Sequence, residues 1–490
     1  MSTSRKAWLL SPCSLAALCL VFALPAAAQI DINSSPSLVG SGARALGMGG
    51  AFIAIADDAT AASWNPGGLT QLERPELSLV YSWKHLGEDF PETLHLGSDG
   101  GYEVDLDDIN YLSFVYPIPR TFMGRNLVLS LNYQRKYDFD RSLDFRARVL
   151  NRIPVSIAWI LDLASWDIDY YQEGGLSALS PAFGFELTDR LSLGVVANIW
   201  DSSLISNNKW KSSTERRLFG QQIVDSLVGG NTVAYLTRGF ANTYEEYDDV
   251  DGVNYTFGAL FKPTERLSIG AVYHTGYSTD VEYTRLNRIL FYRGPIASKG
   301  IDFYQSTLRI EWPGAIGLGA AYRFPNDKLT LSLDVTRRNW DRFVQIDPRE
   351  GLGARISPIT GLSKWRSPHD PTYTVRLGGE YVFFNPDKPR QTYLPSLRAG
   401  LFYDPEPASG RKDTWWGVQY KGNGDPDDYY GVALGGGLLI KNRVNLDLAY
   451  QYRWGNNVRK DTLAGAGPVE RGFSEDVDQH VVYLSTVIYF

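Results

Sequence analysis

Residues 443–454 read RVNLDLAYQYRW, and this stretch decides the fold. The even positions from Val444 to Trp454 hold apolar and aromatic side chains, whereas the odd positions are mainly polar. Because a β-strand sends successive side chains to opposite faces, the pattern predicts a strand with one apolar and one polar face. Soluble β-sandwiches, the alternative, usually have strands of about 5–6 residues. Aromatic residues at the end of a longer run are typical of membrane barrels.

Similar runs recur along the whole chain, and the gaps between them alternate between long and short. The long gaps hold 24–49 residues, and the short gaps hold two or eight. Bacterial outer-membrane barrels have an even strand number, short periplasmic turns and long external loops. The alternation therefore predicts an all-β transmembrane antiparallel barrel of about 14 strands over residues 77–490. The predicted strands are 77–83, 109–117, 126–139, 176–187, 190–203, 253–263, 266–283, 314–325, 328–340, 372–384, 393–404, 429–440, 443–455 and 480–490.

The first residues of the chain have the pattern of an export signal. Arg5 and Lys6 precede a largely apolar segment, residues 7–24, and small residues then lead to Ala28 as a cleavage site. The sequence thus predicts a signal peptide over residues 1–28, which would remove both cysteines of the chain. No later stretch of about 18 apolar residues offers a membrane-spanning helix.

The composition narrows the class of function. The chain has 490 residues, and its net charge of −7 is accompanied by no basic run, which argues against nucleic-acid binding. Only 5 histidines and 2 cysteines are present, and their spacing matches no metal site. We therefore expect no metal, no cofactor and no enzymatic activity.

The last predicted strand ends the sequence on an aromatic residue. Residues 480–490 alternate up to Phe490. In a closed barrel the last strand must pair with the first, which suits a chain that ends within a strand. The terminal aromatic also resembles the signal by which the barrel-assembly machinery recognises outer-membrane proteins.

Residues 29–76 precede the first strand and are rich in glycine and alanine. Such a segment can pack closely against other backbone. Asp57 and Asp58 are expected to cap a short helix over residues 59–63 rather than bind a metal. Asn-Pro-Gly-Gly at residues 65–68 is expected to end that helix and turn the chain.

Three motifs in this segment carry a family resemblance. Residues 42–52, 56–61 and 64–69 read GARALGMGGAF, ADDATA and WNPGGL. Together they resemble the N-terminal hatch of the FadL/TodX-like outer-membrane transporters of hydrophobic compounds. That family has Asn-Pro-Ala where this chain has Asn-Pro-Gly. The hatch or gating residues are then Asp57, Asp58, Asn65, Pro66 and Gly67.

The resemblance implies a function as well as a fold. It implies a hatch inside the barrel and passive uptake of hydrophobic molecules, such as long-chain fatty acids or aromatic hydrocarbons. It also implies release through a gap in the wall beside a distorted strand. The wider superfamily includes PorV-like proteins, so a role in shuttling cargo for a protein secretion system is the alternative. An outer-membrane hydrolase is a third possibility.

Pro181 is the residue that such a gap would use. It lies inside the predicted strand 176–187 but has no N–H to give to a sheet ladder, and a closed barrel has no edge strand to accommodate it. The hypothesis is that Pro181 marks a local ladder break beside a lateral opening. A tolerated β-bulge is the alternative.

Small residues are expected to face the lumen in two strands. They are Ala315, Gly317, Gly319 and Ala321 in one strand, and Gly431, Ala433, Gly435 and Gly437 in the other. Missing side-chain volume at these positions leaves room for a hatch or a ligand, although glycine also eases strand twisting.

The predicted external loops are unusually apolar. Residues 153–166 carry two tryptophans, and residues 218–228 place apolar side chains four residues apart, which predicts one face of a short helix. Exposed apolar loops often mark binding sites, although a self-packed loop core is the alternative. The predicted capture residues are Trp159, Trp166, Phe219, Ile223 and Leu227.

These observations predict a multi-pass β-barrel in the bacterial outer membrane. Its expected partners are a hydrophobic small molecule, the lipid and lipopolysaccharide of that membrane, and the barrel-assembly machinery. We expect a monomer.

Overall fold

The structure of the protein, a computed structural model, describes most of the chain after residue 36. The predicted signal peptide, residues 1–28, lies outside this part. The described residues are 37–89, 101–118, 124–155, 158–204, 208–226, 232–325, 327–349, 354–358, 369–387, 391–407, 425–461 and 473–490.

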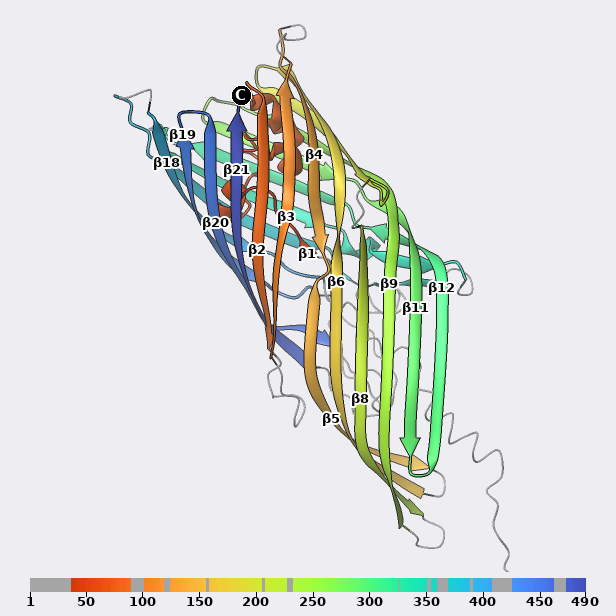
Figure 1. The fold of residues 1–490 in the computed structure, drawn as a ribbon. Coiled ribbons are helices and arrows are strands. Elements are labelled where there is room, and N and C mark those ends of the chain that lie inside the picture. The colour runs from red at the N-terminus through yellow and green to blue at the C-terminus, as the bar shows by residue number, and fades with distance from the viewer. Residues whose placement is uncertain are drawn as a thin grey trace, which may run out of the picture.

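A closed antiparallel barrel of 14 strands forms the body of the molecule, as predicted (Figure 1). The last strand pairs with the first, from Glu76 opposite Tyr489 to Asp89 opposite Asp476, so the wall has no free edge. Each predicted strand overlaps an observed barrel strand. In order around the barrel these are β2 (Glu76–Asp89), β3 (Gly101–Pro117), β4 (Leu127–Asp138), β6 (Ala158–Thr188), β7 (Leu191–Trp200), β9 (Thr232–Phe261), β10 (Leu267–His274), β13 (Ala315–Arg323), β14 (Leu329–Arg338), β17 (Thr372–Val382), β18 (Tyr393–Tyr403), β19 (Tyr430–Ile440), β20 (Val444–Asp461) and β21 (Phe473–Tyr489). The prediction of one strand over 266–283 is wrong after His274, where the chain leaves β10 and enters β11 (Tyr277–Arg293).

Two strands continue far beyond the others and carry a second tier. The 31-residue β6 and the 30-residue β9 each pair with barrel strands along one part and with added strands along the rest. In Figure 1 this outer tier lies at the bottom, away from the C-terminus. It consists of the distal parts of β6 and β9 together with β5 (Arg141–Val155), β8 (Lys209–Ser226), β11 (Tyr277–Arg293), β12 (Ile296–Trp312), β15 (Val344–Asp347), β16 (Ala354–Ile356) and the short 3-10 helix η2 (Trp340–Arg342).

The helix predicted within residues 218–228 is wrong, because residues 209–226 form strand β8. A spacing of four residues fits a helix, but it is also a multiple of the two-residue period of a strand. β6 and β9 offer pairing partners on both sides of β8, and the backbone hydrogen bonds of these ladders decide between the two.

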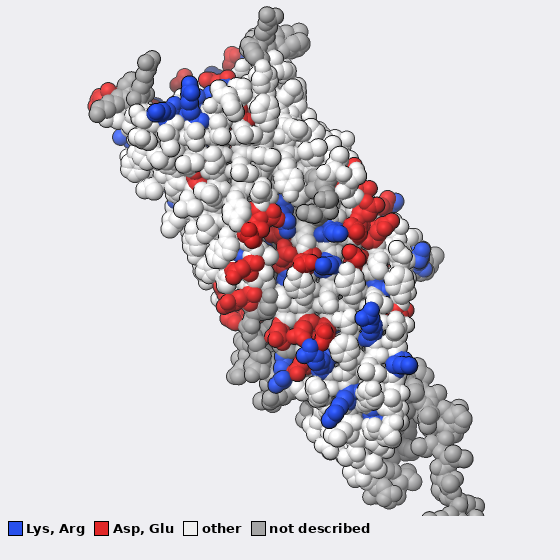
Figure 2. All heavy atoms as spheres, in the orientation of Figure 1, with Lys and Arg blue, Asp and Glu red and all other residues white. Residues whose placement is uncertain are grey.

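The outward surface of the barrel is apolar. Leu318 on β13 is 59% exposed, whereas its neighbours Gly317 and Gly319 are buried against the lumen. Figure 2 shows a nearly uncharged band over the barrel strands and clusters of charge beyond it. Exposed aromatic residues lie near both ends of this band, as expected where a barrel meets the membrane interfaces. They are Tyr116, Phe261, Tyr322, Tyr381 and Tyr393 at one end, and Trp83, Tyr255, Tyr273, Tyr373, Tyr430 and Tyr450 at the other.

Residues 37–75, which we call the hatch, lie inside the barrel at the end where β21 finishes (Figure 1). The short turns between barrel strands lie at the same end, so the hatch end faces the periplasm. No helix within the described part of the chain is long and apolar enough to cross a membrane. The hatch contains β1 (Ser37–Leu38), which pairs with β4, the helices α2 (Ala43–Gly47) and α3 (Ala61–Trp64), and the 3-10 helix η1 (Pro66–Gln71).

The position of the membrane can be tested with one substitution in each tier. Leu318→Arg places a charge near the middle of the apolar band and should lower the free energy of unfolding by about 2–4 kcal/mol. Leu236→Arg, on the exposed outer tier, should change it by less than about 1 kcal/mol. Guanidinium unfolding in lipid vesicles measures both. An equal loss in the two variants would contradict the proposed membrane position.

Candidate functional site

The hatch backbone rests directly on the barrel wall, because the wall positions that face it are glycines. A Cβ atom at Gly258 would lie 2.2 Å from Oδ1 of Asn65, and one at Gly400 would lie 2.2 Å from the backbone N of Gly49. No other residue type allows so close an approach. We call these inward-facing positions the glycine belt: Gly184, Gly194, Gly258, Gly270, Gly319, Gly378, Gly400 and Gly435.

The belt runs from strand to strand. Gly194 pairs with Gly258, Gly270 with Gly319, and Gly378 with Gly400. Gly319 and Gly435 belong to the two small-residue stripes found in the sequence, and both contact the hatch. At these two positions the hatch occupies the space that a side chain would take, whereas at Gly431 and Gly437 wall side chains such as Phe402 and Asp447 occupy it.

Asn65 ties the hatch to the wall. Its side chain is fully buried, Nδ2 donates to the carbonyls of Ile53 (2.8 Å) and Ala259 (3.0 Å), and Oδ1 accepts from the N–H of Gly67 (3.0 Å). The sequence predicted a turn here that ends a helix. The structure adds a second role, because Pro66 and Gly67 begin η1 and Asn65 caps it.

Asp58 orders the turn before α3 instead of capping the predicted helix. The helix begins at Ala61, and Oδ1 of Asp58 accepts from the N–H (2.9 Å) and the hydroxyl (2.6 Å) of Thr60. Burial raises the pKa of Asp58, and the nearby Arg44 guanidinium opposes this shift. Asp57 instead lies 2.6 Å from Nη1 of Arg44, a residue that the sequence analysis did not single out.

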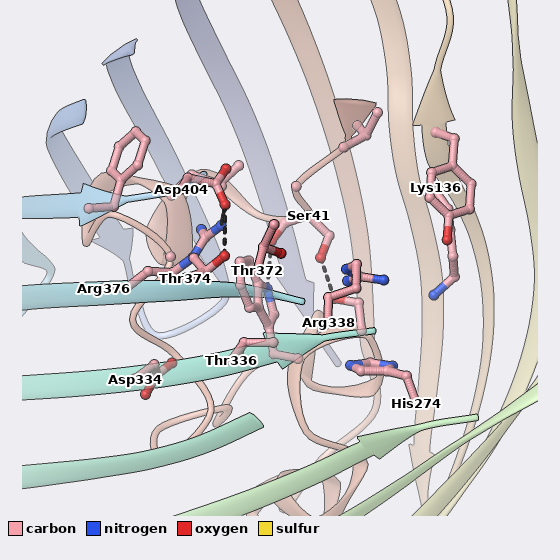
Figure 3. Close-up of a pocket in the computed structure, with 18 of the residues that line it drawn as sticks. Ser41, Lys136, His274, Asp334, Thr336, Arg338, Thr372, Thr374, Arg376 and Asp404 are labelled. Atoms are coloured by element: carbon pink, nitrogen blue, oxygen red, sulfur yellow. Dashed lines mark hydrogen bonds and ion pairs between the residues drawn. The ribbon is translucent and has the colours of Figure 1, made fainter. Parts of the chain in front are cut away.

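A cavity of about 270 Å³ lies in the lumen beside the hatch. Leu46, Ile53 and Trp64 of the hatch line it. The rest of its lining comes from barrel strands, from β11 and η2 at the base of the outer tier, and from connecting residues such as Pro313. Figure 3 shows part of this lining.

One side of the cavity is aromatic. The rings of Trp200 and Tyr277 stack with centroids 5.5 Å apart, and Tyr137 stacks on Trp312 at 4.9 Å. These rings belong to a buried cluster that continues into the outer tier, where Trp210 stacks on Tyr247 at 4.5 Å. The cluster's aromatic members are Tyr137, Phe139, Trp200, Trp210, Tyr247, Tyr277, Tyr283, Tyr304, Trp312, Trp340 and Phe343.

The other side of the cavity is charged, and some of its charges are matched. Arg376 lies 3.6 Å from Asp404, and Arg453 lies 2.9 Å from Glu406. Asp334 accepts a hydrogen bond of 2.8 Å from the N–H of Ile53 in the hatch.

Lys136 and Arg338 are the unmatched cations of this cavity, by which we mean cations without an ion pair; the Arg338 guanidinium lies 5.8 Å from the ring centroid of Trp340. Within the described ranges neither side chain forms an ion pair, and both point with His274 into the same space (Figure 3). His274 Nδ1 lies 3.0 Å from the hydroxyl of Thr256. Lys136, Arg338 and His274 come from β4, β14 and β10, and no pattern in the sequence predicts that they lie together.

The sheet ladder is interrupted beside Pro181. Leu179 pairs with Ile199 and Ala182 pairs with Val196, but Ser180 and Pro181 have no partners on β7. The register is the same on both sides of the interruption, so no residue is inserted there. The side chain of Ser180 donates to Oδ1 of Asn198 across the gap at 2.9 Å.

The predicted capture residues lie in the outer tier. Trp159 and Trp166 are in β6, and Phe219 and Ile223 are in β8. Phe219 is 53% exposed. Neither Phe219 nor Ile223 lines the cavity, and Leu227 lies outside the described residues.

Comparison with known proteins gives one family. The family model described as outer membrane protein transport protein (OMPP1/FadL/TodX) matches residues 176–488. No curated protein sequence matches the chain.

Solved structures share the fold at low identity. A FadL homologue of Pseudomonas aeruginosa is 16% identical, with a TM-score of 0.53 over 93% of this chain and 100% of that one. The toluene transporter TodX of Pseudomonas putida is 14% identical, with a TM-score of 0.52 and the same coverage. The CymD monoaromatic hydrocarbon channel is 15% identical, with a TM-score of 0.50 over 93% of this chain and 99% of that one.

The glycine belt predicts that a single methyl group will displace the hatch. Gly258→Ala should lower the free energy of unfolding by about 1–3 kcal/mol, because the new Cβ overlaps Asn65 and Pro66. Gly436→Ala is the matched control, since a Cβ there meets no atom closer than 3.9 Å. Guanidinium unfolding of both variants in detergent measures the difference. Equal stability of the two variants would show that the hatch does not rest on the belt.

Proposed function

This chain belongs to the outer membrane protein transport protein family (OMPP1/FadL/TodX), and on that premise we propose that it carries long-chain carboxylates across the outer membrane. Membership of this family and a closed barrel with an apolar outer band both locate the protein in the outer membrane. The matched family is one of transport proteins, so the alternative of a PorV-like secretion component is not supported.

The observation that carries the choice of cargo is the two-sided cavity. A hydrocarbon would need only the aromatic side, formed by residues such as Trp200 and Tyr277. Cations without an ion-pair partner beside the aromatic side lower the stability of the protein unless an anion binds to them. A carboxylate head held by Lys136 and Arg338, with an apolar tail along the aromatic rings, satisfies both sides of the cavity.

The route into the cavity follows the aromatic cluster. A ligand would land on the apolar outer tier near Phe219 and Ile223, with Trp159 and Trp166 as further capture residues. Burial at about 25 cal/mol per Å² then favours its transfer toward Tyr137 and the cavity. The hatch must shift to release it, with Asp57, Asp58, Asn65, Pro66 and Gly67 as its positioning groups. Transport is passive, and no chemical step is involved.

Aromatic hydrocarbons are the second candidate cargo. The structural relatives include a toluene transporter and a monoaromatic hydrocarbon channel. The stacked aromatic side of the cavity favours this reading, whereas the unmatched Lys136 and Arg338 favour the carboxylate.

The two cargoes are separated by removing the cations. Lys136→Gln and Arg338→Gln should each weaken binding of a sixteen-carbon carboxylate by about 10-fold or more, because a charge-assisted hydrogen bond contributes about 1.5–3 kcal/mol. The corresponding alcohol should bind the variants about as well as the wild type. Quenching of tryptophan fluorescence measures both ligands, since Trp200 and Trp340 line the cavity.

The matched control for this experiment is Arg309→Gln, a cation on the exposed face of the outer tier. It should leave the binding of both ligands unchanged. Equal losses for the carboxylate and the alcohol in the Lys136 and Arg338 variants would contradict the assignment of these cations to a carboxylate head.

We further propose that cargo leaves through the wall beside Pro181, where the ladder is interrupted. Pro181→Val restores an N–H that can pair with β7, so uptake of a radiolabelled carboxylate by whole cells should fall severalfold. Pro395→Val is the matched control, because Pro395 lies in β18, away from the interruption. Unchanged uptake by Pro181→Val at equal folded abundance would remove this exit from the mechanism.

A further inference from the structure

Arg44 joins the hatch to the barrel wall by charge. Its Nη1 lies 2.6 Å from Oδ1 of Asp57 within the hatch. Its Nε and Nη2 donate to the two carboxylate oxygens of Glu380 on β17, at 2.9 and 2.8 Å. The second contact has the bidentate geometry of the strongest ion pairs between arginine and a carboxylate.

The wall holds Glu380 in place from its other side. Nε of Arg398 on β18 donates to Glu380 at 2.7 Å, and Nη1 of the same guanidinium donates to Asp447 on β20 at 2.6 Å. The side chains of Glu380, Arg398 and Asp447 are 7%, 3% and 2% exposed. Three wall strands, β17, β18 and β20, therefore present a buried receptor to the Arg44 side chain.

The charge balance of this cluster depends on Arg44. Two guanidinium groups, Arg44 and Arg398, face four carboxylates. Without Arg44 a single cation would face all four, with the hatch and wall carboxylates brought close together in a site of low polarity. Their repulsion would then push the hatch away from the wall. The four carboxylates are Asp57 and Asp58 in the hatch and Glu380 and Asp447 in the wall.

None of the other polar contacts that the described residues make between hatch and wall is an ion pair. They include a hydrogen bond from the N–H of Ile53 to Asp334 and several hydrogen bonds between neutral groups. Asn65 donates to Ala259, Thr70 donates to Ser192 at 2.7 Å, and Gln451 donates to the carbonyl of Leu46 at 2.8 Å. Water can replace the partners of such bonds when the lumen opens, whereas an ion pair between buried groups is lost with a much larger penalty.

We infer that Arg44 is the positioning residue that keeps the hatch closed, and that the Arg44–Glu380 pair is the contact that opening must break. This inference rests on the proposed function only in taking hatch movement to be the step that admits cargo. Sealing of the lumen against ions follows from the same contact and requires no cargo.

We call the Arg44–Glu380 pair the latch. Ion conductance of the purified barrel in planar lipid bilayers tests whether it keeps the hatch closed. Arg44→Gln and Glu380→Gln should each raise the leak conductance by about 10-fold or more, since about 1.4 kcal/mol of lost latch energy already shifts the closed-to-open ratio tenfold. Arg44→Lys and Glu380→Asp keep the charges and should remain within about twofold of the wild type. The control is Arg74→Gln, a partly exposed hatch arginine that donates to Asn442 and lies over the ring of Tyr489 but forms no ion pair with the described part of the wall.

Folding is checked by the heat-modifiable gel mobility of the barrel. If Arg44→Gln does not assemble, Glu380→Gln decides, because it leaves the hatch sequence intact. If folded Glu380→Gln leaks no more than the wild type, the inference is wrong. It is also wrong if Arg74→Gln raises the leak conductance as much as Arg44→Gln does. If the latch variants leak more but the wild type binds no carboxylate, the proposed cargo is wrong and the latch is supported. If the wild type binds carboxylate but the latch variants leak no more than it does, the latch is wrong and the proposed cargo is supported.

Discussion

The architecture of this molecule follows from one requirement: backbone N–H and C=O groups that lie in lipid must be hydrogen-bonded to other groups of the protein. Hydrocarbon offers no partner for a free N–H or C=O, so the sheet closes on itself where β2 meets β21. A closed wall offers a plug almost no edge for strand pairing, and among the described residues the hatch pairs with the wall in this way only through the two-residue β1. The hatch is therefore held almost entirely from its flanks, and any lateral exit needs a local interruption of the ladder such as the one at Pro181.

The glycine belt and the Arg44 latch solve two different parts of that problem. The belt lets backbone lie on backbone, as at Gly258 and Asn65, and so defines where the hatch fits. Apolar side chains buried between hatch and wall, such as Phe52, Leu69 and Val196, add stabilisation that has no preferred direction. Arg44 and Glu380 supply a directional attraction at one place. A plug held in this way fits closely, and its ionic contact with the wall is concentrated at one place.

The sequence was sufficient for the barrel because its signal is local. Alternation at residues 443–454 can be read without knowing any neighbour, and lipid outside keeps the alternation regular. The sequence analysis did not predict the outer tier, because its strands depend on pairing between distant parts of the chain. The pairing of Leu218 with Trp166, for example, cannot be inferred from the spacing of apolar residues. The site was harder still. Arg44 meets Glu380 across 336 residues, and Lys136, His274 and Arg338 each look like an ordinary inward polar residue of its own strand.

The two charged regions of the lumen differ in sign, and this difference gives the path a direction. The cavity presents unmatched cations at Lys136 and Arg338, whereas the cluster around Arg44 carries more carboxylates than guanidinium groups. An anionic head group that reaches the cavity is attracted to the first region and repelled by the second. It would pause above the hatch, with its tail along Tyr137 and Trp200, until the latch opens. On this view the same excess of carboxylates that makes Arg44 necessary for closure also prevents cargo from passing a closed hatch.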